Sequence, residues 1–313
     1  MQKGHAMPSI RGRLVRWIVQ KVTTKGTTYQ KPISQQRREM EERMGRIKVS
    51  RKVRIQRVDC SGVPGEWVIP RNLVGNRVVL YCHGGGYYNC SLGTHRAFVA
   101  RLALALRARV LQFDYRLAPE HPFPAAVADS LKVYRWLLSH AVDPASIMIA
   151  GESAGGNLVM TTLLGAKNTG LAVPACAVCL SPHVDFTFSG NSIRDNAESE
   201  LLYTLKELEW MREVYLGDRA SDNQLWKDAM VSPMMADLSG LPPLLIHVDD
   251  TEMLRDDGVT LAERAKLAGV VTELRVWEGL FHAFALVSMI PEAGRVLKEI
   301  AVFGEKYWGM KKS

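Results

Sequence analysis

A serine set between glycines is the residue in this chain best suited to nucleophilic chemistry. It is Ser153, in the sequence Gly151-Glu152-Ser153-Ala154-Gly155. An apolar run at 147–150 precedes it and a helical pattern at 154–167 follows, so the serine falls on a turn between a strand and a helix. Flanking glycines leave room for such a strained turn, and the start of the next helix favours developing negative charge. We therefore predict that Ser153 is a catalytic nucleophile.

A glycine-rich loop follows the strand predicted at 77–82. It reads His83-Gly84-Gly85-Gly86. Acyl transfer needs backbone N–H groups aimed at the oxyanion of a tetrahedral intermediate, and glycines let the main chain approach that closely. A phosphate-binding P-loop is excluded because no Lys-Ser or Lys-Thr pair follows. The loop is therefore predicted to form part of an oxyanion hole.

A serine nucleophile on such a turn needs a base and an acid, in the chain order Ser, acid, His. His282 fits as the general base because it lies in a loop after the strand predicted at 272–276 and before the last helix. His247 falls inside an apolar strand and is predicted to be a core histidine. The residues alone leave the acid open among five carboxylates after the strand at 243–248: Asp249, Asp250, Glu252, Asp256 and Asp257.

The elements that position these residues alternate between short β-rich runs and longer helical patterns from about residue 53 onward. This alternation is typical of a mainly parallel sheet with crossover helices. The predicted strands are 53–58, 66–69, 77–82, 109–113, 147–150, 173–180, 243–248 and 272–276, and the helices are 94–106, 124–139, 154–167, 255–268 and 292–306.

Two segments lie outside this alternation. Residues 10–22 are predicted to form an amphipathic helix with Ile10, Leu14, Trp17, Ile18 and Val22 near one face. We expect that face to pack on the protein, the alternative being contact with an anionic membrane. Residues 186–230 are predicted to form a long, largely helical insertion over the carboxyl edge of the sheet.

Composition and charge narrow the class of protein. The chain has 313 residues, 47% of them hydrophobic and 23% charged, which is ordinary for a globular enzyme. Its net charge of +8 comes from the first 58 residues, while the rest is mildly acidic. Because no nucleic-acid-binding signature accompanies the basic segment, no nucleic-acid partner is predicted. No stretch is long and apolar enough to span a membrane, and no secretion signal is recognisable at the N-terminus.

The cysteines indicate a reducing environment. There are five of them, an odd number at low density, which does not suit a disulfide scaffold and favours a cytoplasmic location. Cys176 and Cys179 have the local spacing of a zinc-binding pair, but they lie in an apolar run without a second Cys or His pair nearby. We therefore predict a buried strand there, and no metal site.

Several separated motifs together resemble the hormone-sensitive-lipase-like family of α/β-hydrolases, also called bacterial family IV esterases. They span residues 80–285 and read HGGGY at 83–87, DYRLAPE at 114–120, PFPAA at 122–126, GESAGGN at 151–157 and FH at 281–282. The resemblance implies an α/β-hydrolase fold with an eight-stranded, mainly parallel sheet flanked by helices. It also implies a catalytic domain over 51–313 and a helical cap from residues 1–50 and an insertion at about 186–230.

The resemblance also implies roles for individual residues. The family's Asp-Pro-Leu-x-Asp pattern maps onto residues 252–256, which makes Glu252, thirty residues before His282, the implied acid, with Asp250 as the alternative. Gly85, Gly86 and Ala154 would donate the oxyanion N–H groups, with His83 and Gly84 supporting the loop. The sequence departs from the family at Glu152, where Asp or Thr is usual.

The expected activity is that of a carboxylesterase acting on short- to medium-chain carboxylic esters through a Ser-Glu-His triad and an acyl-enzyme, without cofactor or metal. The alternatives are hydrolysis of lactones, amides or carbamates by the same triad, or a non-catalytic ligand receptor on this fold. The partner is a small-molecule ester. The family resemblance also suggests a homodimer formed through the last strand, near 272–276.

Overall fold

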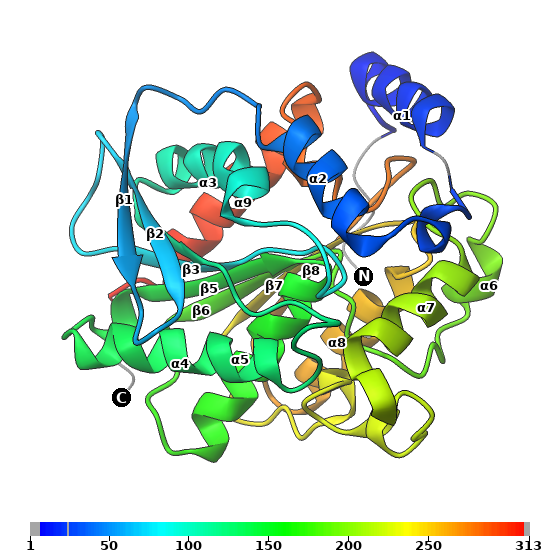
Figure 1. Cartoon of the computed structure of the whole chain (residues 1–313). Helices are drawn as coiled ribbons and strands as arrows, with labels where there is room; N and C mark the ends of the chain where they lie inside the picture. The colour runs from blue at the N-terminus through cyan, green and yellow to red at the C-terminus, as the bar shows by residue number, and fades with distance from the viewer. Residues whose placement is uncertain (1–6, 24, 310–313) are drawn as a thin grey trace.

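The computed structural model describes residues 7–23 and 25–309 and contains one sheet of eight strands in the order β1-β2-β4-β3-β5-β6-β7-β8 (Figure 1). The β1–β2 and β2–β4 pairs are antiparallel and the other pairs are parallel, so the sheet is mainly parallel, as predicted. The strands are β1 (Val53–Asp59), β2 (Pro64–Pro70), β3 (Val78–Cys82), β4 (Arg109–Phe113), β5 (Ile147–Glu152), β6 (Cys176–Leu180), β7 (Leu244–Asp249) and β8 (Thr272–Trp277). They differ from the predicted strands only at their ends.

Helices cover both faces of the sheet. Those of α type are α1 (Ile10–Val22), α2 (Ile33–Met44), α3 (Leu92–Leu106), α4 (Ala125–Ser139), α5 (Ala154–Asn168), α6 (Ser192–Asp195), α7 (Leu205–Leu216), α8 (Arg255–Leu267) and α9 (Pro291–Tyr307). Short 3₁₀ turns are η1 (Thr28–Gln30), η2 (Pro144–Ser146), η3 (Gly217–Arg219), η4 (Leu225–Lys227), η5 (Pro233–Met235) and η6 (Phe284–Leu286). Figure 1 shows α3 and α9 on one face, and α4, α5 and α8 on the other.

The central strand β3 explains this layered arrangement. All five of its residues are buried, and their side chains alternate between the two faces. Val78 and Leu80 belong to the core under α4, α5 and α8, whereas Val79 and Tyr81 belong to the core under α3 and α9. A continuous apolar strand is what a parallel sheet covered on both faces requires.

Other predictions for the sheet are also confirmed. His247 is buried in β7, and the indole N–H of Trp277 donates to its Nδ1 at 3.0 Å. Cys176 and Cys179 are buried in β6, as the apolar run around them indicated. Across the described parts of the chain, the helices are all too short or too polar to cross a bilayer.

The insertion at 186–230 is less helical than we predicted. It contains only α6, of 4 residues, and α7, of 12 residues, besides two 3₁₀ turns. Acidic side chains hold much of the rest in turns by accepting nearby backbone N–H groups. Asp185 accepts the backbone N–H groups of Thr187 and Ser189, Asp222 accepts that of Gln224, and Asp228 accepts that of Met230. Such contacts compete with helix formation.

The N-terminal segment lies beside this insertion, on the right-hand side of Figure 1. Glu207 of α7 accepts the backbone N–H groups of Gly26 and Thr28, both at 2.9 Å. The ammonium group of Lys25 donates to the carbonyls of Ala197 and Glu200 at 2.6 and 2.8 Å. Two segments far apart in the sequence are therefore tied together over the same part of the sheet.

The expectation that α1 packs its apolar face on the protein is wrong. Its buried residues are Gly12 and Val15. The apolar residues that defined the predicted face are exposed instead: Ile10, Leu14, Trp17, Ile18 and Val22. Gly12 explains the reversal, because its lack of a side chain lets the helix backbone approach Leu280 and Glu292 closely on the opposite side.

Candidate active site

Ser153 lies at the turn between β5 and α5, where the chain adopts a strained backbone. Its φ of 55° and ψ of −122° are rarely adopted by a residue with a side chain. A Cβ at Gly155 would overlap the carbonyl group of Cys82 in β3, so the turn requires glycine there. The serine side chain is half-buried at the carboxyl edge of the sheet. The local structure therefore has the form that the motif predicted.

The glycine loop after β3 runs beside this turn. Gly85 and Gly86 have φ of 106° and 60°, and a Cβ at Gly85 would collide with the carbonyl oxygen of Asn89. The backbone N–H groups of Gly85, Gly86 and Ala154 donate no hydrogen bond to any part of the chain that the structure describes. Three unpaired donors close to the serine can receive an oxyanion.

His83 and Glu152 hold the glycine loop in place. The ring of His83 is stacked on Tyr115 with 4.3 Å between centroids, and its Nδ1 lies 2.8 Å from the carbonyl oxygen of Gly84. Burial, together with the neighbouring His95, lowers the pKa of His83 to about 4. His83 is therefore a neutral packing residue at neutral pH.

The carboxylate of Glu152 is buried and receives several donors. Gly84 N–H and the Tyr81 hydroxyl donate to it, and His95 Nε2 lies 2.7 Å from it. Burial alone raises the pKa of Glu152, but the charge and hydrogen bond of His95, with the other donors, outweigh burial and leave the pKa below its ordinary value. Glu152, the residue that departs from the family pattern, thus connects the serine turn to the glycine loop.

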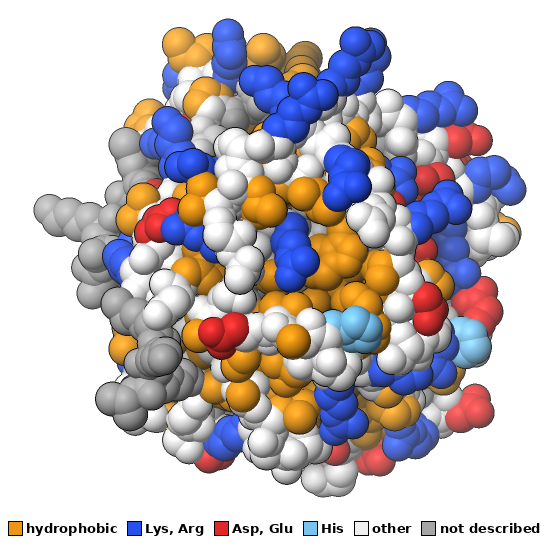
Figure 2. Space-filling view, turned by 90° about the vertical axis from the view of Figure 1, so that its left-hand side faces the viewer, with side chains coloured by type: hydrophobic (Ala, Val, Ile, Leu, Met, Phe, Trp, Pro, Cys, Tyr) orange, Lys and Arg blue, Asp and Glu red, His pale blue; other side chains and the backbone are white. Residues whose placement is uncertain are grey.

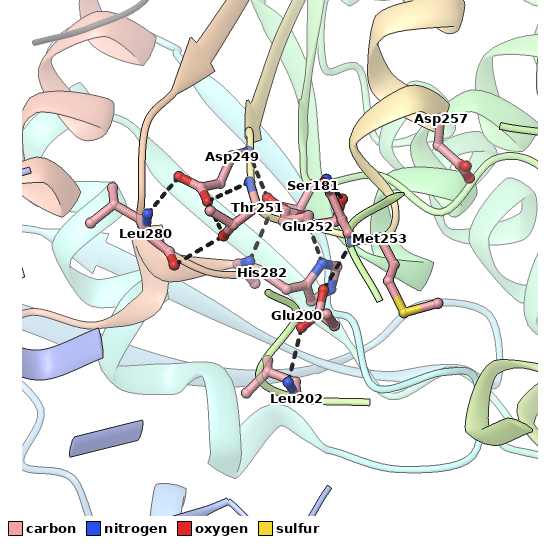
Figure 3. Close-up of polar contacts among 12 residues, drawn as sticks. Ser181, Glu200, Leu202, Asp249, Thr251, Glu252, Met253, Asp257, Leu280 and His282 are labelled. Carbon is pink, nitrogen blue, oxygen red and sulfur yellow. Dashed lines mark hydrogen bonds and ion pairs between the residues drawn. The ribbon is translucent and has the colours of Figure 1, made fainter. Parts of the chain in front are cut away.

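His282 and Glu252 meet at the ends of β8 and β7. His282 Nδ1 lies 2.8 Å from Glu252 Oε2, and both side chains are buried (Figure 3). The other oxygen, Oε1, accepts Ser181 Oγ–H and Asp249 N–H, both at 2.7 Å. Burial alone lowers the pKa of His282, but the hydrogen bond and charge of Glu252 outweigh it and raise that pKa above its ordinary value.

Asp250, the alternative acid, points elsewhere. It is half-buried, and its Oδ1 accepts Gly279 N–H at 2.8 Å. Asp249 is buried and accepts Leu280 N–H at 2.8 Å, while burial and the charge of Glu252 raise the pKa of Asp249 to about 7. Of the carboxylates after β7, Glu252 is the one that contacts the imidazole.

Ser181, which sequence reasoning missed, connects the serine turn to this pair. The backbone N–H of Ser153 donates to Leu180 at 3.0 Å, and the next residue, Ser181, contacts both Glu252 and the backbone N–H of Ala283. In the described part of the chain, Ser153 Oγ and His282 Nε2 are not hydrogen-bonded to each other. The only sequence signal for Ser181 is its place at the end of the strand beside β5.

Glu200 and Arg16 also went unnoticed in the sequence. Glu200 is buried in the insertion, where it accepts Leu202 N–H at 2.9 Å and Met253 N–H at 3.1 Å (Figure 3). Burial raises its pKa. Arg16 of α1 donates to Thr251 Oγ1 at 3.0 Å and to the carbonyl of Leu280. Glu200 thus contacts the loop that carries Glu252, and Arg16 contacts both that loop and the loop that carries His282.

Comparisons with known proteins identify the fold and the family of this chain. The family model of the alpha/beta hydrolase fold matches residues 79–286. An esterase of Acinetobacter venetianus is 34% identical over 252 residues, which is 80% of this chain and 82% of the relative. An acetyl-hydrolase of Streptomyces hygroscopicus is 38% identical over 236 residues, 75% of this chain and 77% of the relative. A crystal structure of an esterase from the bacterial hormone-sensitive lipase family superposes with a TM-score of 0.88 at 36% identity, covering 99% of this chain and 100% of that one.

This chain therefore belongs to the α/β-hydrolase fold family, and within it to the hormone-sensitive-lipase-like group. It is a carboxylic-ester hydrolase, as the motifs predicted.

Proposed function

We propose that Ser153, His282 and Glu252 form the catalytic triad of a carboxylesterase that acts through an acyl-enzyme. The observation that carries the proposal is the buried 2.8 Å hydrogen bond between His282 and Glu252. Because Glu252 holds the Nδ1 proton of the imidazole, Nε2 is left as the base. The raised pKa of His282 suits a group that gains a proton as Ser153 reacts.

In the first step, His282 Nε2 takes the hydroxyl proton while Ser153 Oγ bonds to the ester carbonyl carbon. The resulting oxyanion lies against the N–H groups of Gly85, Gly86 and Ala154. The intermediate collapses as His282 returns the proton to the leaving alcohol, which leaves an acyl group on Ser153. Water then gives a proton to His282 and attacks the acyl carbon, and the acid leaves as the serine recovers its proton.

Residues 1–50 and the insertion at about 186–230 are proposed to form a cap over this site, with 51–313 as the catalytic domain. Aromatic side chains of α7 support this division. Tyr215 stacks on Tyr87 of the glycine loop with 3.8 Å between ring centroids, and Trp210 packs edge-on against Tyr88 at 5.0 Å. The proposed substrates are short- to medium-chain carboxylic esters.

The experiment that tests the triad compares the wild type with Ser153→Ala on p-nitrophenyl esters of increasing acyl length, with lactones and aryl amides included. We expect the variant to keep its melting temperature and lose turnover. Mass spectrometry after rapid acid quench should find the acyl group on the peptide that contains Ser153. Turnover that survives in Ser153→Ala contradicts the proposal, and faster hydrolysis of lactones or amides than of esters redefines the substrate class.

A further inference from the structure

The outward side of α1 is an apolar surface that the described protein does not cover. Its exposed fractions are 77% for Ile10, 54% for Leu14, 56% for Trp17, 41% for Ile18 and 67% for Val22. Ile10, Leu14, Trp17 and Ile18 follow the spacing i, i+4, i+7 and i+8, which places them along one stripe of the helix. Figure 1 shows α1 at the margin of the molecule, away from the sheet.

The opposite side of α1 is firmly attached. Ser9, its N-cap residue, donates from its backbone N–H to Glu292 Oε1 at 2.7 Å and from its hydroxyl to Glu292 Oε2 at 3.1 Å. Val15 is buried in the core with α3 and α9. The helix therefore cannot rotate to bury the exposed stripe without losing these contacts.

The charged residues of α1 itself are all positive. Arg11, Arg13 and Lys21 are exposed on α1, and the helix contains no Asp or Glu. Figure 2 shows the other side of the molecule, that of β1 and β2, where Lys and Arg side chains are interspersed with Asp and Glu. An apolar stripe with Trp, flanked by Lys and Arg, is the composition of a helix that lies in the interface of an anionic bilayer.

We propose that α1 docks this enzyme onto anionic lipid membranes, with the stripe of Ile10, Leu14, Trp17 and Ile18 inserted among the acyl chains and Arg11, Arg13 and Lys21 against the phosphates. A protein partner or a second copy of this chain would also bury the apolar stripe. The membrane fits better because every charged residue of α1 is basic, which complements a uniformly negative surface.

Docking through α1 also brings the catalytic loops near the membrane. Arg16, on the inner side of α1, reaches Thr251, which precedes Glu252, and Leu280, two residues before His282. It also donates to the carbonyl of Ser199 at 2.8 Å. If ester hydrolysis proceeds as proposed above, the docked enzyme meets esters that partition into the lipid.

The test is co-sedimentation of the full chain with vesicles of equal parts phosphatidylglycerol and phosphatidylcholine, and with vesicles of phosphatidylcholine alone. The variant is Leu14→Ser/Lys21→Glu. Its matched control is Lys266→Glu/Leu267→Ser on α8, which changes the same residue types at two exposed positions elsewhere. Hydrolysis of soluble p-nitrophenyl acetate, measured in parallel, reports the catalytic function separately from binding.

We expect the wild type and the α8 control to bind the anionic vesicles at low salt, and the α1 variant to bind them about a hundredfold more weakly. All three should hydrolyse the soluble ester equally. The proposal is overturned if the wild type does not bind anionic vesicles, or if both double variants bind alike. It is also overturned if sedimentation velocity shows that the wild type is a dimer which the α1 variant dissociates, because the stripe is then a protein interface.

Discussion

Replacing Glu252 by Gln tests the proposed triad, because the hydrogen bonds around Glu252 determine how the new amide group is oriented. Ser181 Oγ–H and Asp249 N–H both donate to the same oxygen of Glu252. In Glu252→Gln, these two donors select the amide oxygen for that position. The amide NH₂ then faces His282 Nδ1, which has to accept a proton instead of donating one. The imidazole therefore carries its proton on Nε2 and cannot deprotonate Ser153.

The expected loss follows from this change of tautomer. The corresponding acid-to-amide change in a serine protease lowers kcat about 10⁴-fold, which corresponds to about 5.5 kcal/mol of transition-state stabilisation. We expect a loss of similar size here. The fold should persist, because Gln has nearly the same volume and keeps its contacts with Ser181 and Asp249.

The pH dependence gives an independent readout. The base has to be neutral to act, so kcat/KM falls as the pH drops through the pKa of His282. Glu252 is the main contribution that raises this pKa against the effect of burial. Without its charge, burial dominates and the pKa falls, so the acidic limb of the residual activity moves to lower pH.

The assay is the pH profile of kcat/KM on p-nitrophenyl butyrate for the wild type, Glu252→Gln and Asp250→Asn. Asp250→Asn is the matched control, since Asp250 contacts Gly279 and not the imidazole. The reasoning is refuted if Glu252→Gln loses less than about tenfold in kcat, a change too small for a wrong tautomer. It is also refuted if Asp250→Asn has the larger effect, or if the acidic limb of Glu252→Gln moves to higher pH.

Three further changes test other parts of the site. Gly85→Ala should lower kcat about 10²-fold and the free energy of unfolding by about 1–3 kcal/mol, because φ is 106° and the new Cβ collides with Asn89. Kinetics and urea unfolding measure the two effects. An unaltered kcat would contradict the proposed oxyanion loop. Burial holds the pKa of His183 at about 3, so its stabilising contribution is complete above the unfolded pKa near 6.5 and is lost as pH falls toward 3. At pH 5 this loss is about 2 kcal/mol. The melting temperature of His183→Phe should therefore fall less between pH 8 and pH 5 than that of the wild type. An equal fall in both proteins would contradict this role of His183. Arg16→Met should reduce kcat about tenfold and lower the melting temperature, since the carbonyl groups of Leu280 and Ser199 lose a charged donor. A normal kcat would mean that α1 does not position the catalytic loops.

The parts of this molecule that could be predicted from the sequence are those determined by local patterns. The strand before Ser153 is continuously apolar, and the glycines around it are required by contacts within a few residues or with the neighbouring strand. The same holds for β3 and for His247 in β7. In each case, a short stretch of sequence and the geometry of a parallel sheet are enough.

Contacts between distant segments could not be predicted in this way. Ser181 and Glu252 are 71 residues apart, and nothing local in the sequence marks a serine after β6 as a partner of a carboxylate after β7. The acid itself was left open by the residues and was implied only by the family resemblance. Glu200 and Arg16 belong to segments outside the sheet, where no alternation of strands and helices constrains the position.

The outward face of α1 illustrates a different limit. An amphipathic pattern predicts that a helix has an apolar stripe, but it does not say what covers that stripe. Here Gly12 and Val15 provide a second, smaller contact face, and the hydrogen bonds of Ser9 and Arg16 fix the helix on that side. Specific polar contacts therefore override the rule that the larger apolar face turns inward.

Glu252 shows why a glutamate works where the family pattern has an aspartate. Its carboxylate folds back to accept the N–H of Asp249, three residues earlier, while its other oxygen reaches His282. The neighbouring Asp249, with a pKa raised to about 7 by burial and by the charge of Glu252, holds a proton more readily than an ordinary aspartate. This limits the negative charge buried beside the imidazole.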